Sequence, residues 1–195
     1  MKKMSVSGAL FDIIKLNDIS KTVISKMTAE KVYDLSLEWA QEYDKEFARL
    51  LKADKDYAVK ILSIGRGGKK PRKDIAKWSD VKDYMAYFYD ELYNEAQPEA
   101  PVDTEIISEY VKIFDINDEK DTWFSKIRDM SEKLGYAGDM KAYKAEPEKY
   151  KGNVGDVSTV IRIAVTGRSN TPDLYDIMQI IGNERVQKRL GKYVK

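Results

Sequence analysis

The sequence contains no cysteine and no histidine among its 195 residues. Disulfide bridges, zinc sites built from thiolates or imidazoles, nucleophilic thiols and imidazole-based acid–base catalysis are therefore excluded. Long apolar runs are also lacking, because the brief apolar segment 9–11 near the start is followed by Asp12 and Lys15. We therefore expect no signal peptide and no membrane span, and a cytoplasmic protein.

An excess of charge of either sign is absent as well. The chain has 34 basic and 33 acidic side chains, which leaves a formal net charge of +1. A nucleic-acid surface would therefore have to be a local basic patch, since the rest of the chain is electrically balanced. With 43% hydrophobic residues, the chain is long enough for one large or two small domains with their own cores.

Apolar residues recur at helical spacing through the first half of the chain. The pattern predicts two short helices within residues 5–27, separated by a turn at 17–18, and one long helix from Thr28, its N-cap, to Leu50. A further helix is expected over 54–64, and two more between residues 74 and 93 with a restart at 79–80. The aromatic residues between 84 and 93 could stack on bases, but at this spacing they are more typical of a helical core.

A proline-containing break at 97–101 separates this part from the second half, and we take it as the domain boundary. Beyond it, Asp103 or Thr104 and then Asp121 are expected to cap helices, the second of which ends at Gly135. Residues 138–155 are expected to form an exposed connection or a weak helix. Only 157–165 approaches the two-residue alternation of a strand, and no second candidate strand could pair with it. We therefore predict an all-α fold.

Residues 66–73, called the basic loop below, contain five positive charges, two glycines, a proline and no acid. The glycines do not match a phosphate-binding P-loop, because no Gly-Lys-Ser/Thr sequence follows. Two interpretations stay open for this loop: contact with nucleic-acid phosphates or bases, and solvated surface charge.

The C-terminal corner, residues 162–174, combines a helix end with a helix start. Gly167 is expected to end one helix, and Asn170 or Thr171 to cap the next with Pro172 in its first position. A helix N-terminus beside Arg162 and Arg168 would suit a phosphate or the acceptor edge of an unpaired base. In the alternative, these arginines cap helix ends and pair with Asp173, Asp176 and Glu184.

The last helix of the chain is expected to follow Gly182 and to open with Asn183 and Glu184. Its helical spacing places Val186 and Leu190 inward. The same spacing places its basic residues outward: Arg185, Lys188, Arg189 and Lys192.

Several segments together resemble the C-terminal region of bacterial-type glutamyl-tRNA synthetases, a class I aminoacyl-tRNA synthetase family. They are Arg162–Gly167 (Arg-Ile-Ala-Val-Thr-Gly), Thr171–Leu174 (Thr-Pro-Asp-Leu), Ile181–Leu190 (Ile-Gly-Asn-Glu-Arg-Val-Gln-Lys-Arg-Leu) and Gly8–Asp12 (Gly-Ala-Leu-Phe-Asp). The resemblance covers nearly the whole chain and is strongest at both ends.

This resemblance implies three parts: the end of a stem-contact region at 1–27, a first helical anticodon-binding subdomain at 28–97, and a second at 103–195. The family's Rossmann domain, which binds ATP and Mg and attaches glutamate to tRNA, has no counterpart here. We therefore expect no catalytic residue, no cofactor and no metal in this chain, which should be inactive alone although the parent protein is a glutamate–tRNA ligase.

The resemblance also implies the binding residues. The family's anticodon contacts correspond to Arg162, Thr171, Pro172 and Leu174, and Arg72, with Arg66 second, is our placement for the arginine that reads the third anticodon base. Arg168 is a weaker candidate for the same site and is expected to serve as a backbone contact or a structural charge. The expected partner is tRNA(Glu), with tRNA(Gln) left open, and neither DNA nor a membrane; we expect a monomer. The alternative function is a stand-alone helical protein–protein adaptor with no RNA partner.

Overall fold

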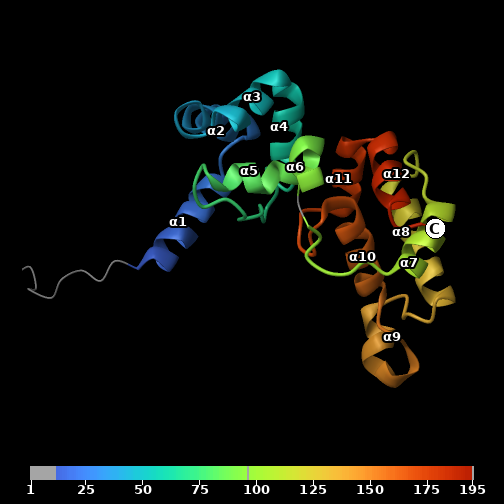
Figure 1. Ribbon diagram of the computed structural model, residues 1–195. Coiled ribbons are helices and arrows are strands. Elements are labelled where there is room, and N and C mark those ends of the chain that lie inside the picture. The colour runs from blue at the N-terminus through green and yellow to red at the C-terminus, as the bar shows by residue number, and fades with distance from the viewer. Residues whose placement is uncertain (1–11, 96, 195) are drawn as a thin grey trace, which may run out of the picture. The chain divides into compact units, whose positions relative to one another are not determined.

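A computed structural model describes residues 12–95 and 97–194 of the chain (Figure 1). Across these residues the chain forms helices joined by turns, and its only β-type pairing is an isolated parallel bridge between Ala137 and Asn153. The predicted all-α fold is therefore confirmed. The chain divides into two compact units, residues 1–84 and 85–195, and each is considered by itself.

The first unit is a small helical cluster around α2. Its helices are α1 (Ile13–Ser25), α2 (Ala29–Tyr43), α3 (Lys45–Ala53), α4 (Lys55–Ser63) and most of α5 (Asp80–Met85). Helix α2 packs against both α3 and α4. The core between them is formed by fully buried side chains: Val32, Ala40, Phe47, Leu51, Ala58, Ile61 and Leu62.

Side-chain caps define the starts of α1, α2, α3 and α4. Thr28 caps α2 by accepting a 3.2 Å hydrogen bond from the Lys31 amide, as predicted. The prediction of one helix from Thr28 to Leu50 is wrong, because Asp44 has non-helical backbone angles, φ −145° and ψ 84°, and ends α2. The Asp44 carboxylate then accepts a 3.0 Å hydrogen bond from the Phe47 amide, which starts α3.

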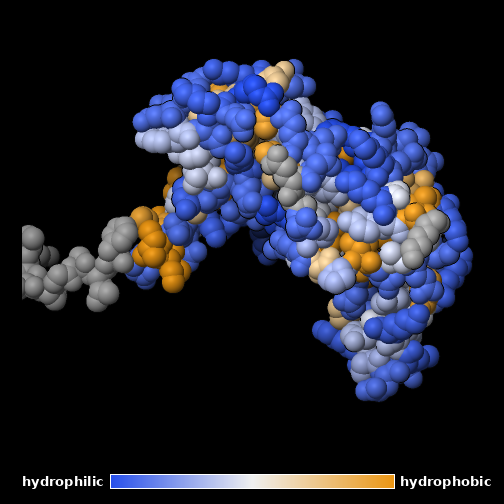
Figure 2. Space-filling view, in the orientation of Figure 1, coloured by the Kyte–Doolittle hydropathy of each residue, from blue (hydrophilic) through white to orange (hydrophobic). Residues whose placement is uncertain are grey.

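Helix α1 is continuous, so the predicted turn at 17–18 is wrong. Its N-cap is Asp12, whose carboxylate accepts a 3.0 Å hydrogen bond from the Lys15 amide. Residues 1–11 of the predicted stem-contact region lie outside the described residues. Helix α1 carries exposed apolar side chains, visible as an orange patch in Figure 2. These side chains are Ile13, Ile14, Leu16, Ile19 and Val23.

The second unit contains the remaining helices and is built around α10. It begins with the 3-10 helix η1 (Ala86–Phe88) and α6 (Asp90–Glu95), followed by α7 (Thr104–Ile113) and α8 (Lys120–Lys133). Short elements α9 (Met140–Ala145) and η2 (Pro147–Lys149) lead to α10 (Val154–Thr166), α11 (Leu174–Ile181) and α12 (Asn183–Gly191). Helix α10 packs against α7, α8 and α12, and its Val157, Ile161, Ala164 and Val165 are fully buried.

The starts of α5, α7 and α8 agree only in part with the sequence patterns. Asp103 caps α7, as predicted. The N-cap of α8 is Glu119 rather than Asp121, and Glu119 makes no side-chain capping bond. Residues 74–79 are not helical, because Asp80 accepts hydrogen bonds from the amides of Ala76 and Lys77 and α5 begins at Asp80.

Arg189 on α12 points inward, contrary to the prediction that it lies outward. It is 2% exposed and donates hydrogen bonds to the carbonyl of Tyr87 at 2.7 Å, to that of Val165 at 2.9 Å and to the Asp90 carboxylate at 2.8 Å. Its guanidinium carbon also lies 3.8 Å from the ring centroid of Tyr93. A buried arginine is tolerated here because acceptors surround it.

These contacts explain why the second unit begins before the proline-containing break. The structure places the boundary between Tyr84 and Met85, whereas the sequence break lies at 97–101. Tyr87, Phe88 and Tyr93 are buried, and the Tyr93 hydroxyl donates to the carbonyl of Ala164 at 3.0 Å. These three aromatics therefore belong to the core of the second unit. The functional roles assigned to 1–27, 28–97 and 103–195 stay predictions.

Candidate nucleic-acid interface

Helix α10 presents Arg162 because of how its two ends are fixed. It starts with a reciprocal capping box, in which the Asn153 side chain accepts from the Gly155 amide and the Asp156 carboxylate accepts from the Asn153 amide, both at 2.8 Å. It ends at Gly167, whose φ of 78° is the left-handed conformation that glycine adopts without strain. Both the helical form of 157–165 and the stop at Gly167 are as predicted. Arg162 consequently lies one turn before the helix end.

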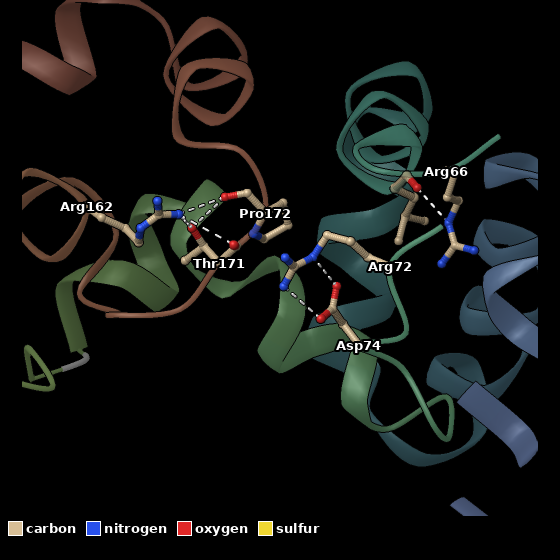
Figure 3. A network of polar contacts seen from close by, with 7 residues as sticks. Arg66, Arg72, Asp74, Arg162, Thr171 and Pro172 are labelled. Atoms are coloured by element: carbon tan, nitrogen blue, oxygen red, sulfur yellow. Dashed lines mark hydrogen bonds and ion pairs between the residues drawn. The ribbon is translucent and has the colours of Figure 1, made fainter. Parts of the chain in front are cut away.

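Three of the predicted site residues contact one another at the C-terminal corner (Figure 3). Nη1 of Arg162 donates to the hydroxyl oxygen of Thr171 at 2.8 Å and to the carbonyl of Pro172 at 2.9 Å. The Thr171 hydroxyl in turn donates to the same carbonyl at 2.9 Å. The arginine therefore cross-links the last turn of α10 to the loop that follows it.

The loop of residues 167–173 is held at two further points. The Glu99 carboxylate accepts from the amide and hydroxyl of Ser169 at 2.7 and 2.8 Å, and the Glu99 amide donates to the Gly167 carbonyl at 2.9 Å. The Thr166 hydroxyl accepts from the Arg168 amide at 3.1 Å. Sequence reasoning did not identify Glu99, which lies in the proline-containing break far from this loop along the chain. The loop is thus fixed in shape by the protein itself.

Solvent reaches this corner at some of its residues only. Arg162 and Arg168 are half-buried, whereas Ser169 and Asn170 are exposed. Thr171 is 6% exposed, and Leu174, at 3%, belongs to the core of the second unit. Leu174, which the resemblance implies as an anticodon contact, therefore does not lie on the surface. Among the predicted residues of this corner, Thr171, Pro172 and Leu174 are buried, which leaves the half-buried Arg162 and Arg168 accessible to a ligand.

The start of α11 differs from the prediction. Its N-cap is Asp173, which accepts from the Asp176 amide at 3.2 Å, so neither Asn170 nor Thr171 caps it and Pro172 precedes the helix. Lys120 lies 2.9 Å from the Asp173 carboxylate and 3.9 Å from that of Asp176. The positive end of this helix is therefore already occupied by carboxylates.

The pKa shifts of Asp176 and Lys120 also show that charged side chains of the protein surround the start of α11. Burial and the neighbouring Asp173 raise the pKa of the Asp176 carboxyl, against the opposing effect of Lys120. Burial lowers the pKa of the Lys120 amine, but its hydrogen bond with Asp173 and the nearby acids outweigh burial, so the net shift is upward. An anion at this corner would have to bind arginine side chains rather than the helix end.

In the first unit, the Arg66 side chain hydrogen-bonds to main-chain carbonyls of two helices (Figure 3). Its Nε donates to the carbonyl of Leu62 at 2.8 Å, and its Nη1 donates to the carbonyl of Ile24 at 2.7 Å. Arg66 therefore ties the end of α1 to the end of α4. Burial lowers the pKa of its guanidinium, against the opposing charges of Tyr84 and Asp74.

Arg72 is the more accessible of the two predicted arginines of the basic loop. Its Nε and Nη2 bind the Asp74 carboxylate in a bidentate pair at 2.8 and 2.9 Å, and its side chain is 37% exposed. The Arg72 amide donates to the Gly65 carbonyl at 3.1 Å, which closes the loop. Gly65 permits this turn with a φ of 69°. The lysines of the loop are exposed: Lys69, Lys70 and Lys73.

Two further features, a metal-binding group of side chains and a membrane-spanning helix, are absent from the described part of the chain. No group of three or more acidic side chains there could hold a metal ion. No helix within residues 12–95 and 97–194 is long and apolar enough to cross a membrane.

Comparison with known families agrees with this architecture. Residues 31–194 match the family model of the anticodon binding domain. The match spans most of the chain, so the chain, which is all-α, belongs to the anticodon binding domain family.

Curated relatives narrow the comparison to one kind of enzyme. The chain is 47% identical to the glutamate–tRNA ligase of Clostridium perfringens strain SM101 over 100% of the chain and 37% of that relative. It is 46% identical to that of Acetivibrio thermocellus over 98% of the chain and 36% of the relative, and 24% identical to that of Bacillus subtilis over 97% and 36%. The chain thus spans little more than a third of the length of these relatives, and the alternative of a protein–protein adaptor is not favoured.

Proposed function

We propose that this chain binds the anticodon region of tRNA(Glu) as part of a glutamate–tRNA ligase. The anticodon binding domain match over residues 31–194 carries the proposal, and the relatives named glutamate–tRNA ligase support it. In this proposal the remainder of the enzyme attaches glutamate to tRNA with ATP and Mg, in the cytoplasm. The present chain supplies RNA recognition as a monomer and is inactive alone. Charging of tRNA(Gln) by the same enzyme is the second possibility.

The C-terminal corner supplies a physical basis for reading an unpaired base. Single-stranded RNA loops are recognised through splayed bases that stack on side chains and present their edges to hydrogen-bond donors. The loop contacts of Arg162 fix the plane of its guanidinium before RNA arrives, because Nη1 is bonded to Thr171 and Pro172. Preorganisation of this kind reduces the entropy lost on binding.

Arg72 is proposed as the second arginine that contacts the anticodon. Its bidentate pair with Asp74 orients the guanidinium in the same way that Thr171 orients Arg162. Arg66 is less suited to base contact, since its donors serve main-chain carbonyls inside the unit.

The proposal is tested by binding to the anticodon stem-loop of tRNA(Glu), measured by fluorescence anisotropy at fixed ionic strength. A hairpin of the same stem with a scrambled anticodon is the control RNA. We expect tighter binding to the matching anticodon and a loss of about 1–3 kcal/mol for Arg162→Ala. Equal affinity for the two hairpins would overturn the proposal, and capture of a protein partner without tRNA would favour the adaptor.

A further inference from the structure

Glu99 fixes the loop of residues 167–173 from a distant segment of the chain. One carboxylate oxygen, Oε2, accepts hydrogen bonds from the amide and the hydroxyl of Ser169, at 2.7 and 2.8 Å. The Glu99 amide donates to the Gly167 carbonyl at 2.9 Å. Ser169 lies 70 residues further along the chain, so the proline-containing break contacts the loop at two points.

The two contacts of Glu99 depend on different parts of the residue. The bond to Gly167 uses the main chain, so a substitution at residue 99 keeps it. The bonds from Ser169 need the carboxylate, which accepts stronger hydrogen bonds than a neutral group does. Glu99→Ala would therefore release Ser169 while the break stays attached to the end of α10 through its main chain.

The position of Ser169 bears on Arg162. Nη1 of Arg162 donates to the Thr171 hydroxyl and to the Pro172 carbonyl, which lie two and three residues after Ser169. Consecutive Cα atoms are only about 3.8 Å apart, so a displacement of Ser169 is transmitted to the acceptors of Arg162. Glu99 holds the first half of the loop and Arg162 holds the second.

The charge of Glu99 gives its side chain a second effect, of the opposite sign. Glu99 is exposed, and a negative charge beside an RNA-binding corner repels phosphate groups. As a charge alone, Glu99 would weaken the binding of every RNA. Any benefit to binding must therefore come from the shape that Glu99 gives the loop, and removal of the carboxylate separates the two effects.

We propose that Glu99 is a positioning residue for anticodon recognition, which acts through Arg162 by holding Ser169. This inference rests on the proposed function and adds to it a residue that acts on the RNA only through its neighbours. The guanidinium donors form a rigid planar fork, so a base edge is matched only when the fork is correctly oriented. Loss of the Glu99 carboxylate should therefore reduce discrimination between anticodons.

The experiment measures affinity for the matching and the scrambled anticodon hairpins, and their ratio reports discrimination. Glu99→Ala removes the contact with Ser169, whereas Glu99→Gln keeps a neutral acceptor for it. Glu148→Ala is the matched control, because it removes the same charge at an exposed position before the opposite end of α10. Glu99→Ala is also combined with Arg162→Ala. Thermal unfolding followed by circular dichroism shows whether each variant folds.

We expect Glu99→Ala to lower the affinity ratio about fivefold, the equivalent of one hydrogen bond. Glu99→Gln and Glu148→Ala should keep a ratio close to that of the native chain. In the Arg162→Ala background, Glu99→Ala should lower the ratio no further, because residues that act through one another are not additive. Ser169→Ala removes only the hydroxyl of an exposed residue and should lower the ratio by a smaller factor, which tests the inference even if Glu99→Ala does not fold.

Tighter binding of Glu99→Ala to both hairpins at an unchanged ratio would show that Glu99 acts only as a charge, and would overturn the inference. An equal loss of discrimination with and without Arg162 would exclude the route through Arg162. In both cases the native chain still prefers the matching hairpin, so the proposed function stands. Equal binding of the two hairpins by the native chain would overturn the proposed function and the inference together.

Discussion

Nη1 of Arg162 lies 2.8 Å from the hydroxyl oxygen of Thr171, nine residues further along the chain. The bond joins the last turn of α10 to the loop before α11, and the 6% exposure of Thr171 shields it from water. Two residues predicted as separate ligand contacts therefore form one unit, in which threonine holds arginine.

This pairing predicts a specific effect of Thr171→Val, which removes the hydroxyl and keeps the branched shape. We expect affinity for the matching anticodon hairpin to fall about five- to tenfold, the equivalent of one hydrogen bond, with discrimination between anticodons reduced. Thr171→Ser retains the hydroxyl and serves as the control. Native-like discrimination in Thr171→Val, measured by anisotropy, would show that Arg162 does not depend on Thr171.

The buried hydrogen bonds of Arg189 predict a large loss of folding stability when its side chain is shortened. In Arg189→Ala, the carbonyls of Tyr87 and Val165 lose their donor inside the core. Urea unfolding should show a loss of about 3 kcal/mol. The adjacent, exposed Lys188 provides the comparison, since Lys188→Ala should change stability by less than about 0.5 kcal/mol. Similar stability of the two variants would contradict the structural role of Arg189.

The lowered pKa of the Asp44 carboxyl predicts that folding stability depends on pH. Burial acts to raise the pKa of its carboxyl, but hydrogen bonds from Lys82 and from the Phe47 and Glu46 amides outweigh burial and lower that pKa. A group whose folded-state pKa is lowered stabilises the folded state above its unfolded pKa, about 3.9. This contribution is lost as the pH falls through the folded-state pKa.

The measurement is urea unfolding of the native chain and of Asp44→Asn across the acidic range. Asparagine keeps an acceptor for the Phe47 amide but loses the charge that attracts Lys82. The native chain should be the more stable at neutral pH; the difference should begin to shrink at about pH 4 and disappear only when the pH falls below the lowered folded-state pKa. A difference that stays constant down to strong acid would exclude the Asp44 charge as its source.

The main-chain contacts of Arg66 predict that it stabilises the first unit, whereas the exposed lysines of the basic loop do not. Arg66→Ala should destabilise the first unit by about 2 kcal/mol, because the carbonyls of Leu62 and Ile24 lose their donor. Lys69→Ala, at an exposed position two residues after Gly67, should leave stability unchanged. An unfolding midpoint for Arg66→Ala equal to that of Lys69→Ala would refute this assignment.

Local sequence signals predicted the helical fold and several of the residues at which its helices begin or end. The cap at Thr28 and the stops at Gly167 and Gly182 follow from side-chain and backbone chemistry within one turn of the residue concerned. The break at Asp44 escaped prediction because the apolar spacing of α2 continues into α3. In such a pattern, a capping aspartate looks like any polar residue on a solvated face.

The parts of the site that escaped prediction depend on tertiary contacts. Arg189 points inward only because Tyr87 and Asp90, about a hundred residues earlier, supply its acceptors. Glu99 and Lys120 reach the C-terminal corner from segments distant in sequence. Arg162 and Thr171 were found through family resemblance, which contains tertiary information that spacing alone lacks.

The buried arginine of α12 also decides where the chain can be divided. A shorter protein starting at residue 103, after the proline-containing break, would omit Tyr87, Asp90 and Tyr93, so Arg189 would keep only the Val165 carbonyl among its hydrogen-bond acceptors. The last turn of α10 would lose the Tyr93 hydroxyl bonded to Ala164. Grafting the C-terminal corner onto another protein would therefore require the segment from Met85 onward, where the second unit begins.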